Sequence, residues 1–321
     1  MTDFLNGLAS QIDPMTLRVH FPSRVVFLCG GAIDPSDPPA PPTMLRDVYY
    51  RFRKSELNDL PYRIVLAEDA EPLTTDAGYP DLLSFESDIA QIVGLIVLFV
   101  ESAGSFAELG AFSALETIAP NLLAVILDHY YDQKSFIKNG PIKYLEERHG
   151  EEAVLSLEIA SLDMKTATDV ASANSKELAK SLEETIVFRM ERLAKWRAFD
   201  PSSEGHKILI MTGLCQEYGA LTQTELRKLL QLLNVHIEPA RLKNFIYCSE
   251  LLGWVKMIRK GHQKYVVALN HANQEKALDW KFHAESPFKD RLRWRADIRA
   301  HWKKHDALRH RAITEVELPG E

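Results

Sequence analysis

Continuous apolar runs alternate with amphipathic stretches through the first half of the chain. Apolar runs separated by helical patterns are typical of parallel strands that are covered by helices on both faces. The predicted strands span residues 24–29, 62–67, 95–100, 122–127 and 153–157, and the predicted helices lie around residues 43–58, 81–93, 105–118 and 140–149. We therefore expect an α/β fold with a doubly wound, five-stranded parallel sheet.

The pattern changes in the second half. A helical stretch of mixed charge, residues 162–196, ends at a polar break, and three short helices are predicted at 206–218, 222–232 and 238–252. Thr222 with Glu225 forms a capping box, and Pro239 suits a first helical turn. The run WVKMIRKGHQKYVVAL then predicts a β-hairpin with a basic turn. Three helices and a hairpin indicate a mainly α winged helix-turn-helix domain.

These patterns divide the chain into four parts. We expect an enzymatic domain at residues 1–160, a connecting helix and linker at 161–205, the winged helix-turn-helix domain at 206–270 and a basic aromatic tail at 271–321.

Composition narrows the class of protein. The chain has 321 residues, 46% of them apolar and 26% charged, as in ordinary globular proteins. It has no apolar run of about 18 residues and no signal-peptide pattern at its start. The three cysteines, Cys29, Cys215 and Cys248, have no metal-ligand spacing. We expect a reduced cytoplasmic protein without a membrane span, a disulfide or a bound metal.

The charge is unevenly distributed. The net charge is −7, yet residues 281–311 carry ten Lys and Arg against four acids. Aromatic side chains are interleaved with these cations, namely Trp280, Phe282, Phe288, Trp294 and Trp302. Such a mixture suits phosphate contact with base stacking, although a charge run is also typical of a solvated helix face. Both interpretations stay open.

The predicted sheet indicates where a ligand would bind. In open parallel sheets, ligands bind beyond the carboxyl ends of the strands, where the strand order reverses. If the order is 2-1-3-4-5, this point lies between the first and third strands, next to Gly30-Gly31 and the loop at residues 101–108. Paired glycines let a ligand approach the backbone, or they form a simple tight turn. Neither GxGxxG nor GxxxxGK[ST] is present.

Glu108 has two interpretations. Ser105 to Glu108 reads S-x-x-E, which fits a capping box in the first turn of a helix. Alternatively, Gly104 and Gly110 clear side chains from around the carboxylate, and the helix N-terminus keeps it ionised. A carboxylate held in this way can face a ribosyl C1′ and support the positive charge that develops as a base departs.

Several segments together resemble the nucleoside deoxyribosyltransferase-like effector proteins of bacterial retrons. They are VVFLCGG, the pair Glu68-Asp69, LLSFE at 82–86, VLFVESAGSFAELGAFS at 97–113 and SFIKNGPIKYL at 135–145. The resemblance spans most of residues 24–145 and is most specific in the ESxGSFxELGAFS block, while the C-terminal half agrees mainly in architecture. The chain departs from the family pattern at Gly94, where an aspartate is common, and at Ser87, where an asparagine is common.

The resemblance implies a toxin with an N-glycosidic-bond-cleaving domain followed by a winged-helix DNA-binding domain. A reverse transcriptase and its multicopy single-stranded DNA (msDNA) hold such a toxin inactive until phage infection, and we expect an oligomeric assembly. The glutamate of the family's ELG motif falls on Glu108, which is the predicted catalytic residue. NAD+ is the favoured substrate, with no further cofactor. Base exchange or hydrolysis on deoxynucleosides remains an alternative, as does a DNA-binding regulator that binds a nucleotide without turnover.

Two sets of binding residues follow from the motifs and the charges. The predicted substrate-binding residues are Gly30, Gly31, Glu68, Asp69, Glu86, Ser102, Gly104, Ser105 and Asn139. The predicted nucleic-acid-binding residues are Arg241, Lys243, Arg259, Lys260, His262, Lys264, Arg291, Arg293 and Arg295.

Overall fold

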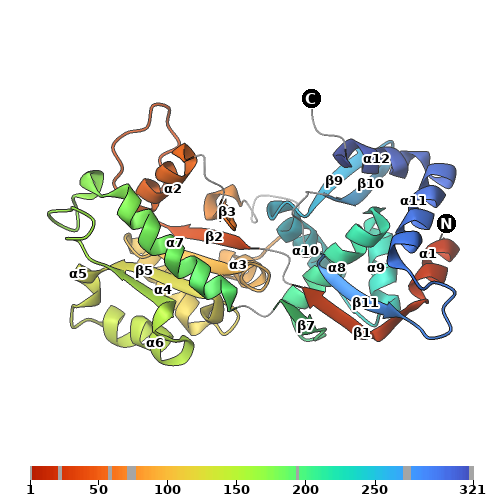
Figure 1. The fold of residues 1–321 in the computed structure, drawn as a ribbon, viewed down its shortest axis with the longest axis horizontal. Helices are drawn as coiled ribbons and strands as arrows, with labels where there is room; N and C mark the ends of the chain where they lie inside the picture. The colour runs from red at the N-terminus through yellow and green to blue at the C-terminus, as the bar shows by residue number, and fades with distance from the viewer. Residues whose placement is uncertain are drawn as a thin grey trace. The chain divides into compact units, whose positions relative to one another are not determined.

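A computed structural model describes residues 2–20, 24–56, 60–70, 77–192, 195–269 and 276–317. Internal contacts group the chain into two compact units (Figure 1). The sheet unit consists of Arg24–Asp69 and Val93–Leu193, and the helical unit consists of Met1–Ser23, Ala70–Ile92 and Ala194–Glu321. Each unit is therefore assembled from segments that are separated in the sequence.

The sheet unit is built on a five-stranded parallel sheet with the order β3-β2-β4-β5-β6. The strands are β2 (Val25–Gly30), β3 (Arg63–Leu66), β4 (Leu95–Phe99), β5 (Leu122–Leu127) and β6 (Val154–Leu157). The predicted five-stranded parallel sheet is confirmed. The chain moves from β2 to β3 in one direction and from β4 to β5 in the other, so the strand order reverses between β2 and β4.

Helices cover both faces of this sheet. They are α2 (Leu45–Ser55), α4 (Ala103–Ala114), α5 (Asp128–Tyr131), α6 (Lys143–His149) and α7 (Ser175–Glu191), with short helical turns at Ala67–Asp69, Ala119–Asn121, Lys138–Ile142, Glu151–Ala153 and Val170–Ser172. α2 and α7 share one core cluster with alternate residues of the strands. Because right-handed crossovers leave β2 and β4 in opposite directions, α2 and α4 lie on opposite faces.

The helical unit contains two small antiparallel sheets. One has the order β11-β1-β7 and the other the order β8-β10-β9. The strands are β1 (Ile12–His20), β7 (Trp196–Ala198), β8 (Ala220–Leu221), β9 (Val255–Lys260), β10 (Gln263–Ala268) and β11 (Leu278–Phe282), and the helices are α1 (Thr2–Ala9), α3 (Leu82–Ala90), α8 (Glu204–Tyr218), α9 (Gln223–Leu232), α10 (Pro239–Leu251), α11 (Arg291–His305) and α12 (Ala307–Glu317). The three helices and the hairpin that were predicted after residue 205 are all present.

The C-terminal aromatic side chains belong to the core of the helical unit. Trp294 and Trp302 have no exposed surface, and Trp280 is 4% exposed. The Trp294 ring meets Trp280 edge-on at 5.0 Å, and the Trp302 indole donates to the Tyr218 carbonyl at 2.9 Å. Of the interpretations left open for this segment, base stacking by these tryptophans does not hold, because packing of α11 against α8 and β11 buries them.

Candidate functional site

The carboxyl ends of β2 and β4 lie side by side, with Gly30 paired to Phe99. Gly30 has φ of +125°, and a Cβ there would lie 2.4 Å from the Phe99 carbonyl oxygen. At Gly31 a Cβ would lie 2.8 Å from Glu101 Oε1. Gly30 is therefore required by its positive φ and by close packing against the backbone, whereas a side chain at Gly31 would have to displace the Glu101 carboxylate and Met44. A contact from either glycine to a substrate stays a prediction.

The loop after β4 enters α4 through two serines. Ser102 is the N-cap, and its hydroxyl accepts from the Ser105 N–H at 3.2 Å. The buried Ser105 hydroxyl accepts in turn from the N–H groups of Glu101 and Ser102 at 2.9 and 2.8 Å. The capping box is therefore closed by Ser102 and Ser105, and the interpretation of Ser105 and Glu108 as that box is wrong. The helix begins at Ala103, which leaves Glu108 in its second turn.

Glu108 is half-buried, and its Oε2 atom is buried without a hydrogen-bond partner among the described residues. Burial raises the pKa of the Glu108 carboxyl, the Arg46 cation lowers it and the Glu68 carboxylate raises it. A buried carboxylate oxygen without a donor costs free energy. Such groups are rare in native proteins and concentrate where a ligand supplies the missing contact.

Arg46 on α2 is the cation of this site, and the sequence did not single it out. Its side chain is 1% exposed, and its two terminal nitrogens form a bidentate ion pair with Glu68. The same nitrogens donate to the carbonyls of Leu28 at 2.6 Å and Gly31 at 2.8 Å. These bonds tie α2 to the end of β2 and to the loop after β3. The only signal in the sequence was a cation beside the apolar positions of an amphipathic helix.

Glu101 is a second residue that was not predicted. Its carboxylate accepts from the N–H groups of Leu45 at 2.6 Å and Arg46 at 3.1 Å, so it caps the N-terminus of α2 from the loop after β4. Burial, which outweighs these two bonds and the charge of Arg46, raises the pKa of Glu101 to about 7. An acid directly after a buried strand was its one signal in the sequence.

Three further predicted substrate-binding residues have other surroundings. Asp69 is exposed, and its carboxylate accepts from the Leu66 N–H at 3.2 Å. Asn139 donates its side-chain amide to the Ser135 carbonyl, and it lines a hollow of about 570 Å³ beside Gly110 on α4. Glu86 is half-buried on α3, within the helical unit. The residues that the structure gathers are Gly31, Arg46, Glu68, Glu101 and Glu108.

Several predicted nucleic-acid contacts are bound within the helical unit instead. Arg241 donates to Asp88 at 2.8 Å and to Glu204 at 2.9 Å. Arg291 and Arg295 both pair with Glu217, which is 2% exposed. Lys260 pairs with Glu315. Arg241, Arg291 and Arg295 therefore already have acidic partners in the fold, and a phosphate contact by these three arginines stays a prediction.

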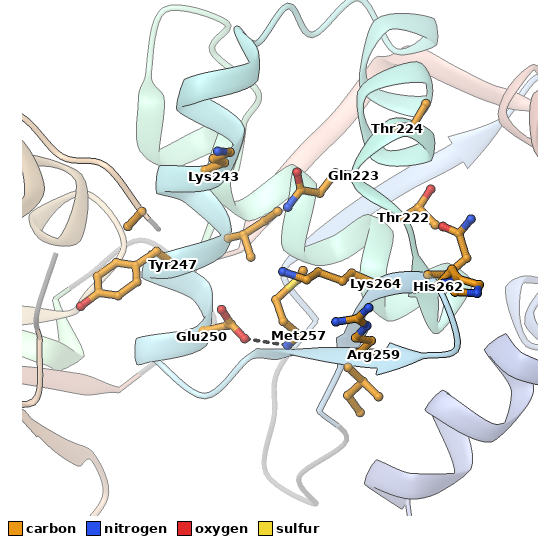
Figure 2. A pocket seen from close by; sticks show the side chains of 14 residues that line it. Thr222, Gln223, Thr224, Lys243, Tyr247, Glu250, Met257, Arg259, His262 and Lys264 are labelled. Carbon is orange, nitrogen blue, oxygen red and sulfur yellow. Dashed lines mark hydrogen bonds between the residues drawn. The ribbon is translucent and has the colours of Figure 1, made fainter. Parts of the chain in front are cut away.

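The remaining predicted cations are accessible. Arg293 is exposed on α11. The other four line a hollow of about 900 Å³ beside the hairpin of β9 and β10 (Figure 2). They are Lys243, Arg259, His262 and Lys264.

The described residues contain neither a cluster of metal ligands nor a membrane-spanning helix. Among the described residues, His, Cys, Asp and Glu form no group of three or more that could hold a metal ion. None of the described helices is long and apolar enough to cross a membrane.

Comparison with known proteins identifies the family. The "Retron Ec86 putative ribosyltransferase/DNA-binding protein" of Escherichia coli is 32% identical over 161 residues, which cover 50% of this chain and 50% of that protein. The "Retron Ec73 putative ribosyltransferase/DNA-binding protein" of Escherichia coli is 30% identical over 135 residues, 41% of this chain and 42% of that protein. The chain spans about half the length of the curated relatives it matches. The model of the STM3845 retron effector protein family matches residues 42–257. This match extends from the loop before Arg46 to the hairpin, and the chain therefore belongs to the STM3845 retron effector family.

Proposed function

We propose that this retron effector is a toxin whose sheet unit cleaves the N-glycosidic bond of a nucleotide, with NAD+ as the favoured substrate. The observation that carries the proposal is the buried, unpartnered Oε2 of Glu108 at the carboxyl end of the sheet, in the electrostatic field of Arg46. The two Escherichia coli relatives are named as ribosyltransferases. That name supports chemistry at a ribosyl carbon.

The chemistry requires few groups. Nicotinamide leaves its ribose as a neutral molecule and takes the bonding electrons to its ring nitrogen, so no general acid has to protonate it. Glu108 supports the oxocarbenium-like charge at C1′ or bonds to that carbon, and water completes the hydrolysis. The products are nicotinamide, ADP-ribose and a proton. Glu108 acts in its ionised form, which burial disfavours and the nearby Arg46 cation favours.

The second part of the proposal concerns control. We assign α8, α9, α10 and the hairpin of β9 and β10 to a winged helix-turn-helix arrangement, because three helices precede an antiparallel hairpin. Through this part, the retron reverse transcriptase and its msDNA would hold the effector inactive until phage infection. The printed name of both relatives includes DNA binding, which supports a nucleic-acid contact.

A product assay tests the enzymatic part. The purified chain is incubated with NAD+, and nicotinamide is followed by chromatography. Glu108→Gln is expected to lower the rate on the order of 10²-fold or more, as loss of one preorganised electrostatic group does. Glu116→Gln is the matched control, since Glu116 is an exposed acid just past the end of α4.

Three outcomes would change the assignment. Full activity of Glu108→Gln would remove this residue from catalysis. Release of free nucleobase from deoxynucleosides, without nicotinamide from NAD+, would make the enzyme a deoxyribosyltransferase or hydrolase. Tight nucleotide binding without any product would instead favour a regulator.

A further inference from the structure

A hollow of about 900 Å³ lies within the helical unit, between α10, the start of α9 and the hairpin of β9 and β10 (Figure 2). We call it the hairpin groove. It is lined by three permanently cationic side chains, Lys243, Arg259 and Lys264, and by one carboxylate, Glu250. The whole chain has a net charge of −7, so this local excess of positive charge runs against the average of the molecule.

The hairpin places two of these cations directly opposite each other. Arg259 on β9 pairs in register with Lys264 on β10, and both side chains are exposed. Like charges at directly opposed positions of an antiparallel pair are destabilising. Stability of the hairpin therefore does not account for the pair. An anion that lies across both side chains removes the repulsion.

The one acid in the groove has a structural partner. Glu250 Oε1 accepts from the Met257 N–H at 2.6 Å, where the hairpin begins (Figure 2). The lining of the groove also includes the apolar side chains of Ile246 and Met257. The groove thus combines cationic and apolar side chains. This combination fits a ligand that carries repeated anionic groups and flat apolar bodies.

Two polar side chains in the first two turns of α10 are not available to read a DNA duplex. Arg241 is held by Asp88 and Glu204. Asn244 is 5% exposed, and its amide donates to the Ala77 carbonyl at 2.6 Å. Helices that read duplex DNA place such N-terminal side chains on base edges in the major groove. Here these two face their own chain, whereas Lys243 on the same helix lines the groove.

We propose that the hairpin groove binds an unpaired nucleic-acid strand, with its phosphates on Lys243, Arg259 and Lys264 and its bases against the apolar lining residues. An unpaired strand exposes phosphates and base faces together, while a duplex hides the faces of its bases. The volume lies at the upper end of the range for small-ligand pockets, which suits a short segment of strand. The inference rests on the proposed nucleic-acid contact of the helical unit and is independent of the chemistry at Glu108.

Fluorescence anisotropy of the full chain with an unstructured oligodeoxythymidine of about 12 nucleotides tests the proposal. The triple variant Lys243→Gln/Arg259→Gln/Lys264→Gln is expected to weaken binding about tenfold or more. The slope of log affinity against log salt is expected to become shallower by about 2, since each lost phosphate contact on a single strand removes about 0.7. The control Lys303→Gln/Lys304→Gln/Arg311→Gln removes three exposed cations of the same unit outside the groove and is expected to leave both quantities nearly unchanged.

Each contrary outcome has a distinct meaning. An equal loss of affinity in the two triple variants would mean that the oligonucleotide binds through general surface charge and not in the groove. Tighter binding of a duplex, unaffected by the groove substitutions, would overturn the groove and keep the nucleic-acid contact. Displacement of the oligonucleotide by equimolar thymidine monophosphate would make it a mononucleotide site. No binding of any strand or duplex would remove both the groove and the proposed contact. Thermal unfolding checks the triple variant, and Lys264→Glu alone replaces it if it does not fold.

Discussion

Glu68 engages both terminal nitrogens of Arg46 in a bidentate ion pair. The two partners differ in exposure, because the Arg46 side chain is 1% exposed and the Glu68 side chain 48%. Arg46 is also held by the Leu28 and Gly31 carbonyls, so the guanidinium group is fixed in place. Both Glu68 and Glu108 therefore share the field of one buried cation. Their influence on each other should be measurable.

Replacing Glu68 and replacing Arg46 should shift the pKa of Glu108 in opposite directions. Glu68→Gln removes a negative charge that raises the pKa of Glu108, so that pKa should fall. Arg46→Gln removes the cation that lowers it, so that pKa should rise. If ionised Glu108 is required, the acidic limb of the pH–rate profile moves with the pKa, down for Glu68→Gln and up for Arg46→Gln.

Carboxyl carbon NMR of the labelled protein, assigned with Glu108→Gln, measures the same shifts without any activity. Asp69→Asn is the matched control, because Asp69 adjoins Glu68 in the chain but bonds to the Leu66 N–H instead. Shifts of the same sign in the two variants would contradict the shared field. A rise in KM alone for Glu68→Gln would instead favour a direct contact between Glu68 and the ribose hydroxyls.

Glu101 should make folding stability depend on pH near neutrality. Its pKa is raised to about 7 in the folded protein from an ordinary value of 4.5, so folding favours the protonated acid. The contribution of Glu101 is then most favourable below about pH 4.5 and is lost as pH rises through about 7, by on the order of 3 kcal/mol in total. Urea unfolding of wild type and Glu101→Gln at pH 5.5 and pH 8 measures it.

The sign of the difference between those two proteins decides the outcome. The advantage of wild type over Glu101→Gln should be larger at pH 5.5 than at pH 8, because glutamine does not titrate. An advantage that grows with pH would mean that the bonds from Leu45 and Arg46 outweigh burial and keep the carboxylate ionised. Glu147→Gln, at an exposed acid on α6, should leave the pH dependence unchanged.

The apolar pattern of the sequence was sufficient to locate the strands, but it was not sufficient to locate the residues of the polar site. Buried parallel strands produce uninterrupted apolar runs, so β2, β4 and β5 could be located, and right-handed crossovers limited their order. Arg46 could not be found in this way. Its partners lie at Leu28, Gly31 and Glu68, which are distant in sequence, and nothing local distinguishes a buried arginine from a solvated one.

The helix that carries Glu108 is present as predicted, but it begins earlier than predicted. Both Ser102-x-x-Ser105 and Ser105-x-x-Glu108 fit the spacing of a cap, and the chain uses the earlier one. The aromatic residues near the C-terminus show the same limit. Composition alone does not distinguish Trp294 and Trp302 in a core from tryptophans on a binding surface, and only the packing of α11 separates the two.

We expect Gly110 to lower the stability of α4 while keeping space for substrate. It lies inside α4, is exposed, and has no atom within 4 Å of where a Cβ would stand. Alanine should therefore stabilise the fold by about 0.5–1 kcal/mol. If the glycine keeps space for substrate beside Glu108, Gly110→Ala should also raise KM or lower kcat. Urea unfolding and the nicotinamide assay measure both effects, and a more stable variant with unchanged kinetics would contradict this role.

Glu217 should be a larger determinant of stability than any cation around it. It is 2% exposed and accepts from Arg291 and, at 2.7 Å, from Arg295 Nε. Glu217→Ala leaves two guanidinium groups without their buried partner and should lower the free energy of unfolding by about 3–5 kcal/mol.

Arg295 and Arg293 separate this structural role from nucleic-acid contact. Arg295→Gln should destabilise the fold without changing the salt dependence of oligonucleotide binding, because the guanidinium group of Arg295 is already paired with Glu217. Arg293→Gln, at an exposed position two residues before Arg295 on the same helix, should leave urea unfolding within about 0.5 kcal/mol of wild type. If Arg295→Gln instead flattened the salt dependence at unchanged stability, the ion pair would have to open on binding, and Glu217 would then be a competitor of the nucleic acid for that arginine.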